Sequence, residues 1–377
     1  MTSVLHVYKT FYPDSYGGIE QAIRHLALGC KIHGVSSEVF TLSREPHPER
    51  FNTNGVFVTQ ASTNIELSST PFSAEAFAKF RALAPSFDLI HYHYPYPFGD
   101  VVKLLSGLKK PSIVTYHSDI IRQRWLKHVY APVQAAFLNS VDRIVCTSDV
   151  YLNTSKTLQK YRCKTTPVPL GLDENSFPNA SPELLQKWQT ELGQPFFLFL
   201  GVLRNYKGVN TLLKAAQGLN AKLVIAGDGP EFSSLKKNAL ELGLDNVHFT
   251  GSITEDDKAA LLELCSGLVL PSHLRSEAFG LVQLEAAMRS KPLICTELGT
   301  GTSYVNEHEN TGLVVPPKNV DALRNAMNFM IYHPAIAARM GHEAHSRFIK
   351  LFSAERMCSA YASIYREVIA DYSAKRA

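Results

Sequence analysis

The sequence lacks a hydrophobic run long enough for a membrane-spanning helix. Such a helix needs about 20 mostly apolar residues, and no stretch of the 377-residue chain supplies them. Its six cysteines lie far apart without a CxxC pair, mostly in apolar stretches, which predicts reduced, buried thiols. Low-complexity segments and repeats of 20–50 residues are also missing, which excludes solenoids and propellers. Because residues 4–8 already read as a strand, we expect no cleaved signal peptide and a cytoplasmic protein.

Two motifs of other nucleotide-binding enzymes are missing as well. Without a GxGxxG fingerprint, a dinucleotide-binding dehydrogenase is disfavoured. Without an Asp-x-Asp pair, the usual carboxylates for a metal-bound diphosphate are absent. His91 and His93 alternate along one predicted strand and, with His117, could suggest zinc, but no Cys or helical His-x-x-x-His pattern accompanies them. We therefore expect neither a metal nor a cofactor.

The chain does contain a regular alternation of apolar strands and helical segments. Several strands are continuous apolar runs, which is typical of parallel strands buried on both faces. The predicted strands are 4–8, 36–42, 56–60, 88–92, 112–116, 143–147, 196–201, 221–226, 246–250, 267–271, 292–295 and 312–315. The predicted helices include 20–33, 208–219, 230–243, 255–265, 318–331 and 354–372.

This alternation predicts an α/β protein with two Rossmann-like, doubly wound domains that face each other across a cleft. Ligands bind in such folds at the carboxyl ends of the strands. The pattern breaks near 165–195, where 165–171 reads as an extended linker. We accordingly expect an N-terminal domain at 1–170, a C-terminal domain at 171–353, and a helix at 354–377 that crosses back to the N-terminal domain.

Two carboxylates separated by seven residues, Glu277 and Glu285, follow the strand 267–271. If Glu277 caps the helix that contains Glu285, both carboxylates face one cleft. The backbone N–H groups that they bracket belong to Phe279, Gly280 and Leu281. A helix start of this kind binds phosphate, and a carboxylate further along can hold sugar hydroxyls. The pattern therefore predicts a site for a nucleotide sugar.

Three shorter motifs also lie between a strand and a helix or at a strand end. Arg204 and Lys207 could clamp a diphosphate and stabilise a phosphate leaving group, or could both face solvent. The pair Gly17-Gly18 would let a ligand approach the backbone, although a plain turn looks the same. His117 ends the strand 112–116, where it could bond a sugar hydroxyl or be merely structural.

Positive charge is concentrated in residues 101–168. This segment has eleven Lys and Arg against three Asp, a local net charge of +8 in a chain of net +4. Such a cluster can bind nucleic acid, anionic lipid or a phosphorylated substrate, or can be a scatter of solvated lysines. Within it, 122–130 interleaves basic and aromatic residues, which suits a membrane interface or a helix that packs Trp125 inward.

Taken together and in this order, these motifs resemble the retaining GT-B glycosyltransferases that include glycosyltransferase family 4, also called group 1. The resemblance is carried by Gly17-Gly18, His117, the segment 201–208 and the pair Glu277 and Glu285. The stretches 297–306 and 311–317 are similar to bacterial O-antigen and lipopolysaccharide mannosyltransferases that use GDP-mannose. The chain departs from the family at Val202, where many members have Arg; here the cation follows at Arg204.

The resemblance implies a hexosyltransferase that moves α-mannose from GDP-mannose, with retention and without metal. The acceptor would be a hydroxyl of an undecaprenyl-diphosphate-linked saccharide in O-antigen assembly. The implied catalytic residues are His117, Glu277, Arg204 and Lys207, and the implied donor-binding residues are Gly18, Phe279, Gly280, Leu281 and Glu285.

The implied partners are the nucleotide sugar, the lipid-linked saccharide and an anionic membrane surface contacted by 101–168, with no role for nucleic acid. The enzyme would be peripheral on the inner face of the inner membrane. Two alternatives stay open: a GT-B glycosyltransferase that uses a UDP-sugar or other donor on a soluble acceptor, and a non-hydrolysing nucleotide-sugar epimerase.

Overall fold

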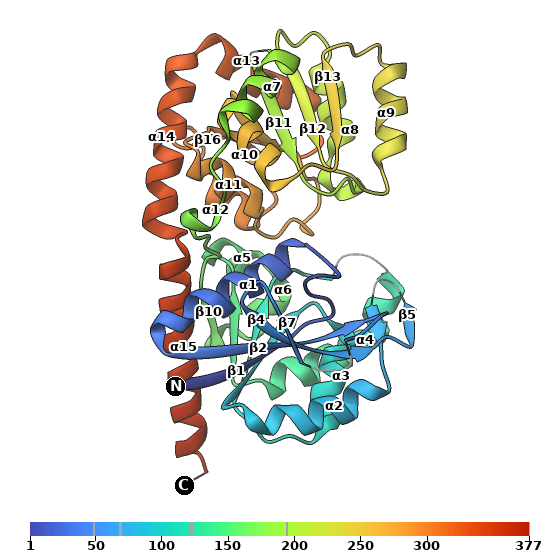
Figure 1. The fold of residues 1–377 in the computed structure, drawn as a ribbon, viewed down its shortest axis with the longest axis vertical. Helices are drawn as coiled ribbons and strands as arrows, with labels where there is room; N and C mark the ends of the chain where they lie inside the picture. The colour runs from blue at the N-terminus through green and yellow to red at the C-terminus, as the bar shows by residue number, and fades with distance from the viewer. Residues whose placement is uncertain (48–49, 68–69, 121–123, 194, 377) are drawn as a thin grey trace. The chain divides into compact units, whose positions relative to one another are not determined.

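A computed structural model describes residues 1–47, 50–67, 70–120, 124–193 and 195–376 (Figure 1). For residue 67 and residues 124–129 it describes the backbone alone. The chain forms two compact units: Met1–Gly171 with Ala354–Ala377, and Leu172–Ser353. Each unit is treated by itself below, and the expected cleft between the domains stays a prediction.

The first unit is built on a sheet with the strand order β10-β9-β8-β7-β1-β2-β4-β3. Neighbouring strands of this sheet are parallel, except that β3 is antiparallel to β4. A separate antiparallel ribbon is formed by β5 and β6. The strands are β1 (Thr2–Val7), β2 (Val35–Ser43), β3 (Phe51–Thr53), β4 (Val56–Ser62), β5 (Ile65–Leu67), β6 (Thr70–Phe72), β7 (Leu89–Tyr94), β8 (Ser112–Tyr116), β9 (Arg143–Cys146) and β10 (Thr165–Pro167).

Helices cover both faces of this sheet, because successive side chains of a strand point to opposite faces. On β7, the Tyr92 ring contacts Phe80 of α2 and Phe137 of α4, whereas the next-door His91 bonds Tyr365 of α15. The helices are α1 (Gly18–Gly29), η1 (Cys30–His33), α2 (Glu75–Leu83), η2 (Ala84–Ser86), α3 (Pro97–Ser106), α4 (Arg124–Ser140), α5 (Asp149–Thr154), α6 (Lys156–Lys160), η3 (Arg162–Lys164) and α15 (Ala354–Ala374).

The last helix, α15, belongs to the first unit although it follows the second in sequence (Figure 1). It packs beside α1 and η1, where the Cys30 thiol donates to the Cys358 carbonyl oxygen at 3.7 Å. Cys358, Tyr361 and Tyr365 are completely buried. The expected return of the C-terminal helix to the N-terminal domain is confirmed.

The second unit has an all-parallel sheet with the strand order β13-β12-β11-β14-β15-β16. The strands are β11 (Phe196–Leu200), β12 (Lys222–Ala226), β13 (Val247–Gly251), β14 (Gly267–Leu270), β15 (Leu293–Thr296) and β16 (Gly312–Val315). The helices are η4 (Glu174–Ser176), α7 (Pro182–Leu192), η5 (Asn205–Lys207), α8 (Val209–Ala216), α9 (Phe232–Glu241), α10 (Glu255–Leu264), α11 (Leu281–Met288), α12 (Gly301–Val305), α13 (Val320–Tyr332) and α14 (Pro334–Leu351).

In the core of the second unit, alternate residues of the strands pack against the helices on one face of the sheet. Phe197 and Phe199 of β11 are fully buried there together with Ile225 of β12, and α8 and α13 supply Leu212 and Met327. Each Å² of apolar surface that folding removes from water stabilises the folded state by about 25 cal/mol, so the burial of large side chains is the main stabilising contribution. The apolar runs of the sequence are thus buried strands, as predicted.

In the parallel part of each sheet, the strand order changes direction at one point. In the second unit it lies between β11 and β14, and in the first between β1 and β7. At such a point the loops at the carboxyl ends diverge and leave room for a ligand. The residues 201–208 follow β11 and 271–280 follow β14, so two of the predicted motifs lie at one switch point.

Every strand predicted from the sequence is present, but three features differ from expectation. Residues 165–167, predicted as linker, form the edge strand β10, where Pro167 is tolerated because an edge strand can spare an N–H donor. The short strands β3, β5 and β6 were not predicted. Among the six cysteines, all free, Cys163 is exposed and the others are buried as expected.

Among the described residues, no helix combines the length and the apolar character needed to span a bilayer.

Candidate functional site

The predicted cation Lys207 and carboxylate Glu277 meet at the switch point of the second unit. Lys207 Nζ lies 2.6 Å from Glu277 Oε2, which also accepts a hydrogen bond from Ser272 Oγ at 3.0 Å. The Lys207 and Glu277 side chains are 13% and 9% exposed. A buried ion pair needs further hydrogen bonds to offset desolvation, and Ser272 supplies one.

Backbone contacts hold the two loops that carry this pair. The Lys207 turn, η5, ends at Gly208, whose φ of 74° lies in the left-handed region. A Cβ at Gly208 would lie 2.0 Å from the carbonyl oxygen of Pro271. In return the N–H of His273 donates to the carbonyl oxygen of Tyr206 at 2.9 Å. Glycine is required here because both the dihedral angle and the close approach exclude a side chain.

The charge of Glu277 favours the protonated form of Lys207. Burial disfavours its charged form, but attraction to Glu277 outweighs burial, so the pKa of Lys207 is raised above its ordinary value. Arg204 is exposed and lies close enough to Lys207 to oppose that rise. Within the described part of the chain Arg204 has no ion pair. One buried and one exposed cation on a single turn are suited to a diphosphate.

The predicted capping role of Glu277 is wrong. Helix α11 begins at Leu281, and its N-cap is Gly280, with φ 79° and ψ 63°. Glu277 lies in the loop, three residues before Gly280. Its carboxylate contacts Lys207 and Ser272 and does not cap the helix. Phe279 is buried and its ring packs 6.0 Å from that of Phe352. The first N–H groups of a helix have no acceptor four residues back, and at this helix start the Gln283 N–H donates to the Gly280 carbonyl oxygen at 2.9 Å.

The second carboxylate of the pair, Glu285, meets a different lysine. Lys258 Nζ of α10 lies 3.2 Å from Glu285 Oε2 and 2.6 Å from Glu255 Oε2. Burial opposes the charge of Lys258, but the two carboxylates raise its pKa above the ordinary value. A pocket beside this pair is lined by Phe177, Pro178, Glu255, Lys258, Ala259, Leu262, Glu285, Met288 and Arg289.

Sequence reasoning missed Lys258, although a signal was available. In the predicted helix 255–265, Lys258 lies at positions i−3 and i−4 to Leu261 and Leu262, so a cation interrupts an apolar stripe. A lysine on a buried stripe requires a paired carboxylate. Glu285 provides it. Ser272, which bonds Glu277, was also missed.

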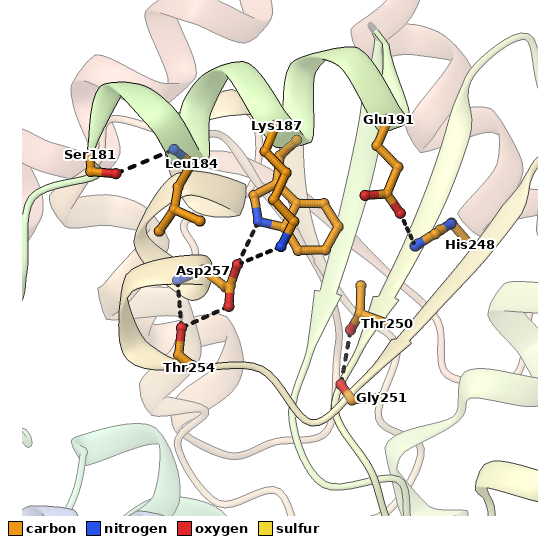
Figure 2. A network of polar contacts seen from close by, with 10 residues as sticks. Ser181, Leu184, Lys187, Glu191, His248, Thr250, Gly251, Thr254 and Asp257 are labelled. Atoms are coloured by element: carbon orange, nitrogen blue, oxygen red, sulfur yellow. Dashed lines mark hydrogen bonds and ion pairs between the residues drawn. The ribbon is translucent and has the colours of Figure 1, made fainter.

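The N-terminus of α10, the helix that carries Lys258, is held against α7, as the contacts of Thr254 and Asp257 show (Figure 2). Thr254 caps the helix by accepting from the Asp257 N–H at 3.0 Å. The Asp257 carboxylate accepts from Lys187 at 3.3 Å and from Trp188 Nε1 at 2.9 Å, both on α7 (Figure 2). Groups on α7 and at the start of α10 therefore hold the Asp257 carboxylate, and Asp257 directly precedes Lys258 in the sequence.

The loop after β15 completes the surroundings of Glu277. Thr300 Oγ1 donates to the carbonyl oxygen of Glu277 at 2.8 Å, and the Gly301 N–H donates to that of Ala278 at 2.7 Å. A Cβ at Gly301 would lie 2.5 Å from the Phe279 ring. The stretch 297–306, singled out in the sequence, thus supports the backbone that carries the proposed donor-binding residues.

In the first unit, Gly17 and Gly18 lie where β1 leads into α1. Gly17 is the N-cap of α1, and Gly18 is exposed at its first position. A Cβ at Gly17 would lie 2.5 Å from Glu20 Oε2. The buried Glu20 accepts hydrogen bonds from Thr10 and Ser15 at 2.7 and 2.8 Å, which closes the loop that precedes the helix. Gly17 thus leaves room for a buried carboxylate, and the backbone of Gly18 is exposed.

His117 directly follows β8 and is 4% exposed. Its Nε2 shares a hydrogen bond of 3.0 Å with Nδ1 of His93. Burial lowers the pKa of His117 to about 3, so the ring is neutral near pH 7. A neutral imidazole has one donor and one acceptor, and the described residues leave Nδ1 of His117 without a partner. That atom can bond a hydroxyl.

Comparison with known proteins matches most of the chain to family models. Residues 181–347 match the family model "Glycosyl transferases group 1", and residues 16–176 match "Glycosyltransferase Family 4". A D-rhamnosyltransferase, WbpZ, of Pseudomonas aeruginosa is 48% identical over 351 residues, 93% of this chain and 92% of the relative. The chain belongs to glycosyltransferase family 4. The O-antigen chain mannosyltransferase C of Escherichia coli is 42% identical over 97% of this chain and 98% of its own.

Solved structures show the fold of this glycosyltransferase. Sucrose-phosphate synthase from Thermosynechococcus elongatus superposes with a TM-score of 0.81 at 22% identity, covering 98% of this chain and 100% of its own. WaaG, a glycosyltransferase involved in lipopolysaccharide biosynthesis, has a TM-score of 0.68 at 16% identity over 96% and 99% of the two chains. The expected GT-B fold is confirmed.

The glycosyltransferase gathers three buried histidines, His6, His91 and His93, whose nearest ring nitrogens lie within 4.8 Å of one another. This spacing resembles a metal site. Both nitrogens of His91 are already used, by Tyr365 Oη at 2.8 Å and Thr115 Oγ1 at 2.7 Å. Those of His6 are used by His93 at 3.0 Å and Ser37 at 3.3 Å. Hydrogen bonding thus accounts for the ring nitrogens of His6 and His91 without a metal.

In the basic segment 101–168 of the enzyme, several cations are bound by the protein itself. Lys110 and Lys164 each donate to two backbone carbonyl oxygens, at 2.7 to 3.1 Å, and Arg162 donates to Asn153 at 2.7 Å. The exposed cations include Lys109, Lys156 and Lys160. Arg122 and the side chains of Arg124, Trp125 and Lys127 lie outside the described residues. Part of the positive charge of this segment therefore belongs to side chains that bind other groups of the protein.

Proposed function

We propose that this glycosyltransferase transfers α-mannose from GDP-mannose onto a hydroxyl of a lipid-linked saccharide in O-antigen assembly, with retention and without metal. The observation that carries the chemistry is the buried Lys207–Glu277 pair at the switch point of the second unit. The two relatives above, an O-antigen chain mannosyltransferase and a D-rhamnosyltransferase, support the substrate class.

In the proposed reaction, the bond between the sugar C1 and the β-phosphate oxygen of the donor breaks. A bond from C1 to the acceptor oxygen forms on the same face, and the acceptor proton passes to the released phosphate. Lys207 and Arg204 stabilise the charge of the leaving diphosphate, and the N–H groups at 279–281 add donors. Glu277 and His117 hold the sugar, Glu285 holds the ribose, and Gly18 brings backbone close to the transferred group.

A second donor is favoured by the similarity to a D-rhamnosyltransferase. D-Rhamnose is D-mannose without the hydroxyl at C6, so the two donors differ by one polar group. A site that hydrogen-bonds a hydroxyl rejects the analogue without it by about 10⁴-fold or more, whereas an apolar pocket discriminates only about 10²-fold. The ratio of kcat/KM for the two donors therefore decides between the sugars.

The test is an assay of GDP-mannose, GDP-D-rhamnose, UDP-glucose and UDP-GlcNAc with bacterial lipid extract as acceptor and EDTA present. We expect transfer from a GDP-sugar into the lipid fraction, unchanged by EDTA. Transfer only from a UDP-sugar, or only to soluble sugars, contradicts the proposed substrates. Conversion of the donor without an acceptor indicates the epimerase instead, and dependence on added Mn²⁺ or Mg²⁺ contradicts the metal-free mechanism.

We propose further that the first unit docks on anionic membrane through the exposed cations of the segment 101–168. Each such cation adds about 1 kcal/mol near an anionic surface. Flotation with anionic vesicles should fall when Lys109, Lys156 and Lys160 are all changed to Glu. The matched control changes three exposed lysines of the second unit, Lys214, Lys236 and Lys237. Equal losses for both triples contradict a defined docking surface, and so does flotation that high salt leaves unchanged.

A further inference from the structure

A row of hydrogen-bonded side chains crosses the sheet of the first unit to His117. From Ser37 of β2 the row passes to Nε2 of His6 on β1 at 3.3 Å. Nδ1 of His6 shares a 3.0 Å bond with Nε2 of His93 on β7, and Nδ1 of His93 shares a 3.0 Å bond with Nε2 of His117. The strands β2, β1, β7 and β8 are consecutive neighbours. The row therefore runs perpendicular to the strands, and its last ring is the one proposed to contact sugar.

The strand register explains why these rings meet. His6 pairs with His91, and His93 pairs with Thr115, so with the period of two along a strand His6, His93 and His117 lie on one face. The rings of His6 and His93 stack 5.3 Å apart, and so do those of His93 and His117. Helix α15 covers this face, as the bond from Tyr365 to His91 shows. His6 and His93 are 0% and 1% exposed, which keeps water from the bond between their rings.

Neutral rings in such a row must all adopt the same tautomer. Burial lowers the pKa of His6 to about 3 and that of His93 well below its ordinary value, so each ring carries one proton near pH 7. If His6 donates from Nδ1, His93 must accept at Nε2 and donate from Nδ1, and His117 must then accept at Nε2. All three protons are then on Nδ1. If His117 donates from Nε2, all three are on Nε2.

We propose that His93, supported by His6, is a positioning residue that couples the tautomer of His117 to its own. The row thereby decides whether the free Nδ1 of His117 donates to a sugar hydroxyl or accepts from one. The effect on catalysis rests on the proposed role of His117 in sugar binding. The coupling of the three tautomers does not, because it depends on the hydrogen bonds within the first unit alone.

The coupling is tested by ¹⁵N NMR of the histidine-labelled protein, because the shifts of Nδ1 and Nε2 report the tautomer. In the wild-type protein we expect His6, His93 and His117 to share one tautomer. His6→Phe should give His117 averaged shifts, because it removes the ring that bonds His93. Among the described hydrogen bonds, His6 is linked to His117 only through His93. A mixture of tautomers among the three wild-type rings, or an unaltered His117 in His6→Phe, overturns the proposal.

Two further variants separate this coupling from a loss of packing. His91→Phe is the matched control, since His91 is equally buried on the same face but bonds Tyr365 and Thr115 instead of the row. It should leave His117 in a single tautomer. His6→Asn places an amide where Nδ1 of His6 lies and should restore the single tautomer; it also serves if His6→Phe does not fold. Averaged shifts for His117 in His91→Phe overturn the proposal.

Kinetics connect the row to the reaction. His6→Phe should lower kcat with the donor about tenfold, the effect of one hydrogen bond to the transition state, and His6→Asn should recover it. A changed tautomer with unchanged kcat overturns the effect on catalysis. Absence of glycosyl transfer by the wild-type protein contradicts the proposed function instead, and the NMR result then still decides the coupling.

Discussion

Lys207 Nζ lies 2.6 Å from Glu277 Oε2, and the two residues come from loops after adjacent strands, β11 and β14. The pair joins the predicted phosphate-binding cation to the predicted sugar-binding carboxylate. Because both side chains are mostly buried, each requires the other for its charge to be stable. A donor that brings a diphosphate to this turn therefore meets a lysine that is already charged and positioned.

Replacing Lys207 by Ala should lower kcat by a hundredfold or more. The side chain would no longer stabilise the charge that develops on the diphosphate, a contribution of several kcal/mol. Lys214→Ala is the matched control, because Lys214 is an exposed cation on the next helix, α8. Steady-state kinetics with thermal unfolding of each variant measure both effects. Near-normal turnover by a folded Lys207→Ala protein contradicts the proposed site.

Glu285 and Lys258 can be distinguished by neutral substitutions. If Glu285 holds the donor ribose, Glu285→Gln should lower kcat/KM about a hundredfold. Lys258→Met, which removes the same ion pair but not the donor contact, should lower it less than tenfold. Both variants break a partly compensated buried pair, so we expect each to lose about 1–3 kcal/mol of stability. Equal losses of kcat/KM in the two variants would mean that Glu285 acts only through the ion pair.

The buried histidines predict acid sensitivity of the first unit. Burial lowers the pKa of His6 and of His117 to about 3, whereas the unfolded chain has the ordinary value of 6.5. Between these values the unfolded state binds more protons, so stability is full above pH 6.5 and falls as the pH decreases. The loss is about 1.4 kcal/mol per pH unit for each ring. Urea unfolding at pH 7 and pH 5 should show a smaller difference for His117→Asn than for wild type. An equal difference would mean that His117 titrates normally in the folded protein.

Gly208 and Gly218 provide a matched test of the loop contact. Both have a left-handed φ, 74° and 72°, but a Cβ at Gly208 would meet the Pro271 carbonyl oxygen at 2.0 Å while Gly218 faces open space. Gly218→Ala should cost about 1 kcal/mol for the dihedral alone. Gly208→Ala should cost at least about 3 kcal/mol, because the loops must separate. Chemical denaturation measures both, and equal costs contradict the observed contact between the loops.

Part of the candidate site could be predicted because its motifs are local. Arg204 and Lys207 follow a buried strand, and His117 directly follows another, so the sequence places them at the carboxyl edge of a sheet. The capping role of Glu277 was predicted wrongly because an N-cap cannot be distinguished from a loop residue without knowing its partners. Glu277 bonds Lys207 and Ser272, and the helix starts at Gly280 instead.

The sequence by itself determined the α/β class, the two-domain order and the positions of the predicted strands, because hydrophobic periodicity and turn residues act over short distances. The tertiary structure decided which polar groups meet. Lys258 reaches Glu285 because α10 and α11 belong to one layered unit, and His6, His93 and His117 bond because the register of parallel strands aligns them. Such pairings depend on strand order and register, which contacts between distant segments of the chain fix.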